Sequence, residues 1–417
     1  MTLAELSGFI AEAQLLSPRD PDVANIVDLA GSIAGWLGGP AVASGGARSV
    51  GSPPAARARR TPRIDRLSQQ LSRVRGVVFV IADGLGVEQI ETSAPGGFLA
   101  GTMRSELRSV YPSTTATALT SLASATWAGT HGVTGWWTHI PRLARTLCAV
   151  TFSERGTNAD AGAIRVDMGE IVPVGSMYQT DMVAVSSLLP RYIVDSPFAR
   201  WTRAETPIAP YRSLGHALRR ATRRARSTEG RFLLSVYLPH VDSTIHKWGT
   251  DHAETHAVIG ELDRGLERLA SRMPADVAVV LTADHGLVDL DHTLHEVIED
   301  GHPLLDGLLL PPTGEGTNPV FHVREGAERE VREALDQSEA GAAFRLVPTD
   351  VLAQAGFFGP DGIDPEVRGR FGTHVGVAER PALLEYVPAG RQSIRHRGVH
   401  GGLRPGEMRV PLCVAGG

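Results

Sequence analysis

The stretch VVFVIADG, residues 77–84, runs six apolar residues directly into an acidic residue and a glycine. Two similar runs follow, FLLSVYL at residues 232–238 and VAVVL at residues 277–281, and acidic residues and histidines come soon after each. Continuous apolar runs of this length are typical of strands that are buried on both faces, as in a parallel sheet covered by helices. We therefore expect an α/β fold with a largely parallel central sheet flanked by helices.

Amphipathic helical patterns separate these apolar runs, as in THAVIGELDRGLERL at residues 255–269. Alternation of strands and helices favours a sheet of parallel strands joined by crossover helices. In open sheets of this kind, ligands bind beyond the carboxyl ends of the strands. Because each run is followed by polar residues at that end, the sequence predicts a functional site along this edge of the sheet.

The composition limits the classes of protein to which the chain can belong. It has 417 residues, and 42% of them are hydrophobic, which is enough for a sizeable core. The 41 basic and 46 acidic side chains give a net charge of −5, so we expect no stable binding of nucleic acid. The two cysteines, Cys148 and Cys413, cannot form a disulfide scaffold. The N-terminus lacks the basic start of a secretory signal and residues 26–37 are too few to span a bilayer, so we expect a cytoplasmic protein with no membrane partner.

Carboxylates and imidazoles gather at the predicted sheet edge. They come from four segments: Asp83, the D-x-x-x-H pair Asp242 and His246, the adjacent Asp284 and His285, and His400 in the sequence VHGG. Carboxylate oxygen and imidazole nitrogen together suit zinc, manganese or iron rather than calcium. The set is large enough for two ions about 3.5–4 Å apart, the spacing that clamps a phosphoryl group.

A run of hydroxyl residues, YPSTTATALT at residues 111–120, marks the start of a predicted helix over residues 116–125. Hydroxyls at a helix N-terminus lie near backbone N–H donors and the positive end of the helix dipole. Taken alone, the run favours simple capping by Ser113 or Thr114. Beside the ligand set, it favours a hydroxyl nucleophile whose pKa is lowered by a bound metal.

Several motifs together resemble the alkaline phosphatase superfamily. They are DGLG at residues 83–86, YPSTTATALTSL followed by THGV at residues 130–133, the D-x-x-x-H pair, TADHG at residues 282–286, TGEG at residues 313–316 and GVHGGLRPGEM at residues 398–408. Within the superfamily, the chain is most similar to the type I phosphodiesterase / nucleotide pyrophosphatase branch. The resemblance extends from about residue 22 to the C-terminus.

The resemblance implies two divalent metal ions, usually Zn²⁺, with Mn²⁺ or Fe as alternatives. One ion would be held by Asp242, His246 and His400, and the other by Asp83, Asp284, His285 and the nucleophile. The nucleophile position of the family falls on Thr115, with Thr114 as the alternative because two threonines are adjacent. An Asn that helps to hold the phosphoryl oxygens in the nucleotide pyrophosphatases is replaced by Ala118, and Thr117 or backbone N–H groups are candidates to substitute for it.

The substrate pocket is less well marked than the metal ligands. Trp136 and Trp137 follow His131 and are candidates for an aromatic wall, with packing beneath a loop as the alternative. His374 is a weaker candidate for the same pocket. We interpret His131 itself as a structural histidine.

The resemblance also divides the chain and implies its reaction. It predicts an N-terminal helical extension and flexible linker at residues 1–62, a core at residues 63–290, a small α+β cap insertion at residues 291–395 and a return to the core at residues 396–417. The implied activity is hydrolysis of a small phosphorylated substrate, possibly a nucleotide, by a phosphodiesterase or nucleotide pyrophosphatase that forms a phosphothreonine. Alternatives are a phosphomonoesterase, a phosphonoacetate-type hydrolase and a catalytically silent metal-binding protein.

Overall fold

The three apolar runs form neighbouring strands at the centre of one sheet. β1 (Gly76–Ala82) pairs in parallel with both β8 (Phe232–Leu238) and β9 (Val277–Thr282). The sheet has seven strands in the order β2-β18-β9-β1-β8-β6-β7. The outer strands are β6 (Ala184–Pro190), β7 (Ile208–Tyr211), β2 (Met103–Arg108) and β18 (Arg409–Gly416), of which β18 runs antiparallel to both its neighbours. The predicted α/β fold with a largely parallel sheet is confirmed.

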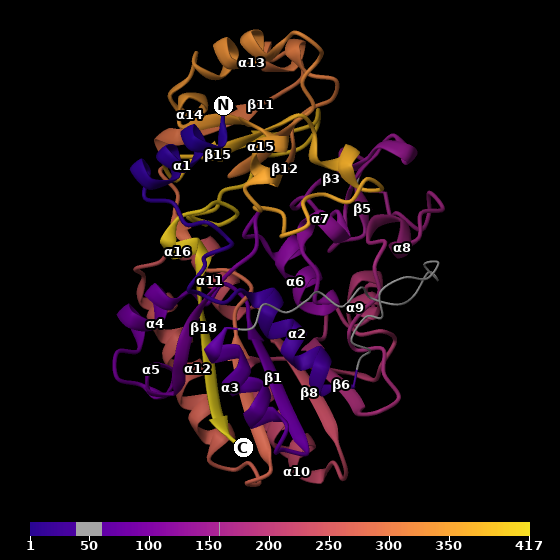
Figure 1. Cartoon of the computed structure of the whole chain (residues 1–417), viewed down its shortest axis with the longest axis vertical. Helices are drawn as coiled ribbons and strands as arrows, with labels where there is room; N and C mark the ends of the chain where they lie inside the picture. The colour runs from indigo at the N-terminus through magenta and orange to yellow at the C-terminus, as the bar shows by residue number, and fades with distance from the viewer. Residues whose placement is uncertain (39–60, 158) are drawn as a thin grey trace.

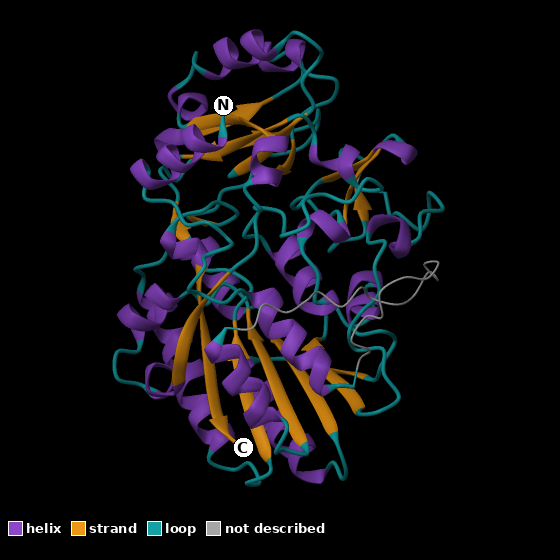
Figure 2. Ribbon diagram, viewed as in Figure 1, coloured by secondary structure: helices purple, strands orange, loops and turns teal. Residues whose placement is uncertain are grey.

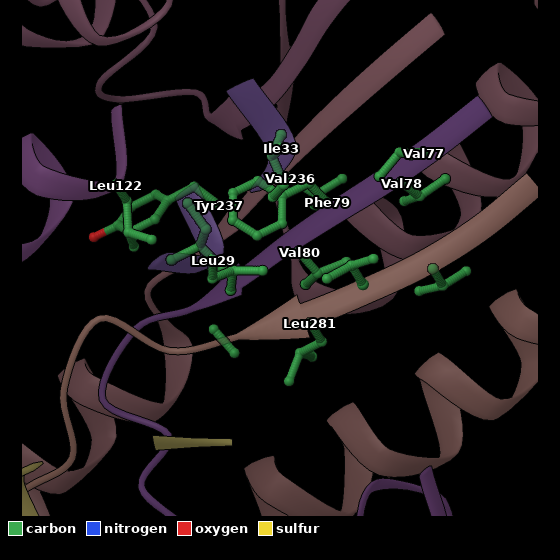
Figure 3. Packing of buried hydrophobic residues seen from close by; sticks show 14 of the residues in the cluster. Leu29, Ile33, Val77, Val78, Phe79, Val80, Leu122, Val236, Tyr237 and Leu281 are labelled. Carbon is green, nitrogen blue, oxygen red and sulfur yellow. The ribbon is translucent and has the colours of Figure 1, made fainter. Parts of the chain in front are cut away.

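Helices cover this sheet, as Figure 2 shows. They are α2 (Ile26–Trp36), α3 (Pro62–Leu71), α4 (Val87–Ser93), α5 (Phe98–Thr102), α6 (Thr115–Ser124), α9 (Pro197–Thr202), α10 (Leu214–Ser227), α11 (His240–Trp248) and α12 (Ala253–Ala270). Every residue of β1 is buried, which explains why its sequence is apolar without alternation. In Figure 3, Leu29 of α2 and Leu122 of α6 lie beside β1 and β8 in the main core. Each such side chain contributes roughly 1.5–3 kcal/mol to folding when it is fully buried.

A second sheet forms within the segment that the sequence predicts as a cap insertion (upper part of Figure 1). Its strands are β12 (Thr313–Glu315), β13 (Asn318–Phe321), β15 (His374–Ala378) and β14 (Phe344–Pro348), in that spatial order. The helices α13 (Glu328–Leu335), α14 (Glu339–Ala342) and α15 (Thr349–Gln354) and the parallel pair β11 (His295–Ile298) and β16 (Leu383–Tyr386) complete it. The segment leaves and rejoins the main core at one short ladder between β10 (Val288–Asp289) and β17 (Gly398–Val399). A final short helix, α16 (Pro405–Met408), precedes β18.

The N-terminal helices divide between the two halves of the molecule. The computed structural model describes residues 1–38, 61–157 and 159–417, so most of the flexible linker predicted within residues 1–62 lies outside the described residues. α1 (Leu3–Glu12) packs against α15 of the insertion through Leu6 and Phe9, whereas α2 packs into the core of the main sheet. The sequence predicted one N-terminal extension and did not anticipate this division.

A third, small sheet lies beside the second sheet. It consists of β3 (Thr138–Ile140), β4 (Arg145–Cys148) and β5 (Ser153–Glu154), and the short helices α7 (Ala128–His131) and α8 (Met168–Ile171) flank it in the chain. Trp137 and Gly314 exchange two backbone hydrogen bonds, which tie this sheet to β12 of the insertion. Short 3-10 turns occupy Pro141–Leu143, His292–Leu294, Pro303–Gly307 and Arg368–Phe371. In the described part of the chain, no helix combines the length and the apolar character that a membrane crossing requires.

Candidate active site

The predicted metal ligands meet at the carboxyl edge of the main sheet. Asp83 follows β1 directly, Asp284 and His285 follow β9, and His400 follows β17. Asp242 and His246 lie four residues apart on α11, so the helix presents both on one face. These side chains form two groups, Asp242 with His246 and His400, and Asp83 with Asp284 and His285. Within each group the candidate ligand atoms all lie within 4.8 Å of one another.

The group around Asp83 contains two buried carboxylates, and burial disfavours their ionised forms. Asp83 and Asp284 are both fully buried. Burial raises the pKa of Asp83 well above its usual value, and the nearby Asp284 and Asp242 carboxylates raise it further. Burial also raises the pKa of Asp284, against the lowering effect of His285. Tyr237 donates a hydrogen bond to Asp83 Oδ2, but among the described residues Asp83 Oδ1 and Asp284 Oδ2 have no hydrogen-bond partner.

Hydrogen bonds fix which nitrogen of two histidines faces the carboxylates. His246 Nδ1 lies 2.8 Å from the carbonyl oxygen of Gly398, and His285 Nδ1 lies 3.0 Å from that of Gly286. Because a carbonyl oxygen can only accept, each Nδ1 carries a proton, so the neutral form of either ring has its lone pair at Nε2. His285 Nε2 lies 3.5 Å from both Asp83 Oδ1 and Asp284 Oδ2. Three acceptor atoms that face one another in this way fit a bound cation.

The group around Asp242 has the same character. Asp242 Oδ1 lies 3.2 Å from His246 Nε2 and 3.7 Å from His400 Nε2. Burial acts to raise the pKa of Asp242, but the hydrogen bond and positive charge of His246 outweigh it, so that the pKa is lowered. Burial lowers the pKa of His400 well below its usual value, and the neighbouring His285 and His246 add to this effect. A neutral His400 beside an ionised Asp242 is the state that a divalent metal requires of its ligands.

Thr115 is the first residue of α6, and its side chain lies beside the group around Asp83. Its Oγ1 is 3.1 Å from His285 Nε2, and the side chain lines the adjoining cavity. Thr114 is fully buried and donates its hydroxyl hydrogen to Glu315 Oε2 at 2.7 Å. It makes no side-chain cap to α6. These contacts support Thr115 rather than Thr114 as the nucleophile.

Glu315 joins the insertion to the start of α6, a contact that the sequence analysis missed. Its carboxylate accepts hydrogen bonds from the Thr114 hydroxyl and, at 3.3 Å, from the backbone N–H of Trp136. Burial raises the pKa of Glu315, against the lowering effect of these two hydrogen bonds. The only signal in the sequence was the acidic residue within TGEG, whose role depends on a tertiary contact.

A cavity of about 680 Å³ opens beside Thr115. Trp136 and Trp137 line it, as predicted for an aromatic wall. Thr117 and His374 are not among its described lining residues. Thr117 donates its hydroxyl to the carbonyl oxygen of Val133, and His374 lies on β15 with its ring beside the Thr373 hydroxyl. Further polar and aromatic lining residues were not singled out from the sequence: Arg155, Tyr192, Arg203, Tyr386 and Arg391.

His131 contacts α6 through Ser121, and its hydrogen bonds indicate a structural role. Its Nδ1 accepts from the backbone N–H of Val133 at 3.1 Å, so Nε2 carries the proton toward Ser121 Oγ at 2.9 Å. The ring is fully buried, and burial lowers the pKa of His131 to about 3, with a smaller contribution from Arg370.

We expect His131 to make the protein less stable in mild acid. Below pH 6.5 the unfolded chain binds a proton at this residue and the folded chain does not, so stability falls as the pH drops from 6.5 toward 3. At pH 5 the loss is about 2 kcal/mol. The free energy of unfolding, measured in urea at pH 7.5 and pH 5, should fall between these pH values in the wild type. The fall should be smaller by this amount in His131→Gln. The exposed His292→Gln is the control and should leave the drop unchanged; equal drops in the wild type and His131→Gln would contradict the assignment.

Comparisons with known proteins agree with this geometry. The family model for type I phosphodiesterase / nucleotide pyrophosphatase matches residues 77–401. Among solved structures, murine ectonucleotide pyrophosphatase / phosphodiesterase 5 is 16% identical with a TM-score of 0.58, over 82% of this chain and 88% of that chain. A related murine structure is an inactive variant in complex with AMP.

A second solved enzyme has the same fold. Phosphonoacetate hydrolase from Sinorhizobium meliloti 1021, in complex with phosphonoacetate, is 16% identical with a TM-score of 0.56, over 82% of this chain and 90% of that chain. No curated protein sequence matches the chain. Since the family model covers well over half of the residues, the chain belongs to the type I phosphodiesterase / nucleotide pyrophosphatase family of the alkaline phosphatase superfamily and is a hydrolase of phosphoester bonds.

Proposed function

We propose that the chain hydrolyses phosphodiesters by attack of the Thr115 hydroxyl on phosphorus. The observation that carries this proposal is the position of Thr115 Oγ1, 3.1 Å from His285 Nε2 and on the wall of the large cavity. The hydroxyl bonds to phosphorus as its proton leaves, and the ester bond to the leaving alcohol breaks. Water then cleaves the phosphothreonine and restores Thr115.

Two divalent cations, most simply Zn²⁺, fit the two groups of carboxylates and imidazoles. Asp242, His246 and His400 would hold one, and Asp83, Asp284, His285 and Thr115 the other. When bound, such ions neutralise the carboxylates, lower the pKa of the Thr115 hydroxyl and polarise the phosphoryl group. The unpartnered oxygens of Asp83 and Asp284 support this assignment, because a buried carboxylate oxygen without a partner is costly.

The backbone at the start of α6 is suited to hold the phosphoryl oxygens. The Thr114 side chain does not cap the helix, so the first N–H groups of α6 are available to an anion beside Thr115. This supports the proposal that backbone donors replace the Asn that the family carries at the position of Ala118. Two supports keep the site in place: Tyr237 holds Asp83, and Glu315 holds Thr114.

The size of the cavity favours a diester over a monoester. A volume of about 680 Å³ is in the range of pockets that enclose a whole organic ligand, and Trp136 and Trp137 offer apolar rings to it. A phosphomonoester with a small alcohol or a short phosphonate would leave most of this space unfilled. The AMP complex of the murine relative is consistent with a nucleotide substrate, and nucleotide esters are the first candidates.

Turnover of four substrates by protein loaded with Zn²⁺, Mn²⁺ or Fe²⁺ tests the proposal. We expect kcat/KM to be higher on bis(4-nitrophenyl) phosphate and a dinucleotide than on 4-nitrophenyl phosphate and phosphonoacetate. Elemental analysis of the same samples should give about two ions per chain. Highest activity on phosphonoacetate, or full activity in metal-free protein, would refute the proposed reaction.

A further inference from the structure

Arg203 is a buried cation that faces the cavity without an anionic partner. It follows directly after α9, is 5% exposed and lines the cavity. Among the described residues, its guanidinium donates no hydrogen bond and has no carboxylate within 4.0 Å; its Cζ lies 5.3 Å from the centre of the Tyr178 ring. Its Nε atom is buried and has no hydrogen-bond partner in the described part of the chain.

Such an arrangement is unusual for arginine. The guanidinium stays charged at all physiological pH values and offers five N–H donors. Buried charges in proteins are normally paired, because removing an isolated charge from water is costly. An arginine that is kept buried beside a cavity, with donors free toward it, is suited to bind a carboxylate or phosphate through two parallel hydrogen bonds.

The passage from Thr115 to Arg203 runs along α6. Thr115, Leu119 and Ala123 are four residues apart and all line the cavity, so one face of the helix forms its wall. The eight residue steps from Thr115 to Ala123 correspond to about 12 Å along the helix axis. The carbonyl oxygen of Ala123 accepts from the Met177 N–H, and the next residue is the Tyr178 beneath Arg203. Through these contacts Arg203 lies toward the Ala123 end of this wall, away from the nucleophile at its other end.

The walls between the two ends are mainly apolar. They include Leu119 and Ala123 of α6, Leu189 of β6 and Phe198 of α9. A group that occupies this passage would gain from burial of apolar surface, while its polar ends would be held by the metal ligands and by Arg203.

We propose that Arg203 is a specificity-determining residue that binds a second anionic group of the substrate. The substrate class is a phosphoester in which an apolar spacer joins the reacting phosphoryl group to a carboxylate or a second phosphate. The inference rests on the proposed function of the cavity, because it places the reacting phosphorus at Thr115.

Calorimetric titration of the zinc-loaded protein with alkylphosphonates tests this without turnover. Three probes of equal spacer length end in a methyl group, a carboxylate or a phosphate, and a series of spacer lengths is compared. We expect an anionic end to increase affinity by about 10- to 100-fold over the methyl end. The anionic probe with the larger gain identifies the group that the site takes. The gain should fall to about 1 in Arg203→Met and be partly kept in Arg203→Lys.

Arg200→Met is the matched control, because Arg200 lies on α9 with a side chain that is 55% exposed and is not among the described cavity residues. It should keep the full gain. Equal affinity of the wild type for all three probes, or an undiminished gain in Arg203→Met, would overturn the inference.

Binding of an alkyl monocarboxylate to metal-free protein reports on Arg203 even if the phosphoryl site is wrongly assigned. Loss of that binding in Arg203→Met supports the inference, and binding that is absent in the wild type or equal in both proteins rejects it.

Discussion

Replacement of Thr115 by alanine is expected to lower kcat on bis(4-nitrophenyl) phosphate by roughly 10³-fold or more. The reason is that the variant has no oxygen at the position that faces His285 Nε2 and the cavity. Binding of substrate should change much less, because the carboxylates, imidazoles and helix N–H groups remain. Stopped-assay measurement of nitrophenol release, with metal content determined on the same sample, gives the comparison.

Two further substitutions separate the role of the hydroxyl from that of the fold around it. Thr115→Ser keeps an oxygen at the same position and should retain activity within about 10-fold of the wild type. Thr114→Ala removes the hydrogen bond to Glu315 but leaves Thr115 in place, so it should lower activity less than Thr115→Ala. If the order were reversed, with Thr114→Ala the more damaging, the nucleophile would be Thr114.

Acid-quenched protein gives an independent view of the same residue. A phosphothreonine at residue 115 should be detectable by mass spectrometry of peptides from a reaction stopped during turnover, and it should be missing from Thr115→Ala. A phosphoryl group found on another residue, in a protein with normal turnover, would reject the assignment of Thr115.

The site at the sheet edge could be predicted because each buried strand is a continuous apolar run and its ligand residues follow soon after it in the chain. β1, β8 and β9 are continuous apolar runs, and the residues directly after them are bound to share one edge once the strands pair in parallel. Once β1 and β9 are known to be neighbours, Asp83 and Asp284 are expected to lie close together. His400 was harder, since it follows a two-residue strand, and only its motif marked it.

Residues that act through tertiary contacts could not be found in this way. Glu315 and Arg203 lie in segments with no strong periodicity, and their partners, Thr114 and Tyr178, are distant in sequence. Their meaning comes from burial: an acidic residue that is buried against a hydroxyl, and an arginine that is buried without a counter-ion. His374 was proposed as a weaker pocket candidate, but it lies on β15 of the second sheet and is not among the described residues that line the cavity.

We expect that replacing one carboxylate in either group will strongly reduce activity and remove the ion which that group holds. Asp242→Asn and Asp284→Asn should each lower kcat/KM by roughly 10³-fold, because each loses several kcal/mol of charge stabilisation in the transition state. Zinc content should fall from about two ions to about one per chain in each variant. Asp251→Asn is the control, because this carboxylate follows α11 with a side chain that is 93% exposed and belongs to neither group. Unchanged metal content in both variants would contradict the assignment of the two groups.

The stability of the metal-free protein gives the sharper test of why these carboxylates are present. Without cations, the burial and mutual repulsion of the Asp83 and Asp284 carboxylates oppose folding, as the raised pKa of each indicates. Metal-free Asp284→Asn should therefore be more stable at pH 8 than the metal-free wild type, by about 1–2 kcal/mol in chemical unfolding. Added zinc should reverse the order, because only the wild type has the full ligand set and binding stabilises the folded state alone. A substitution that removes activity and yet stabilises the metal-free chain identifies a residue whose role is to bind metal rather than to stabilise the fold. An equal loss of stability with and without zinc would instead mean that Asp284 has a structural role.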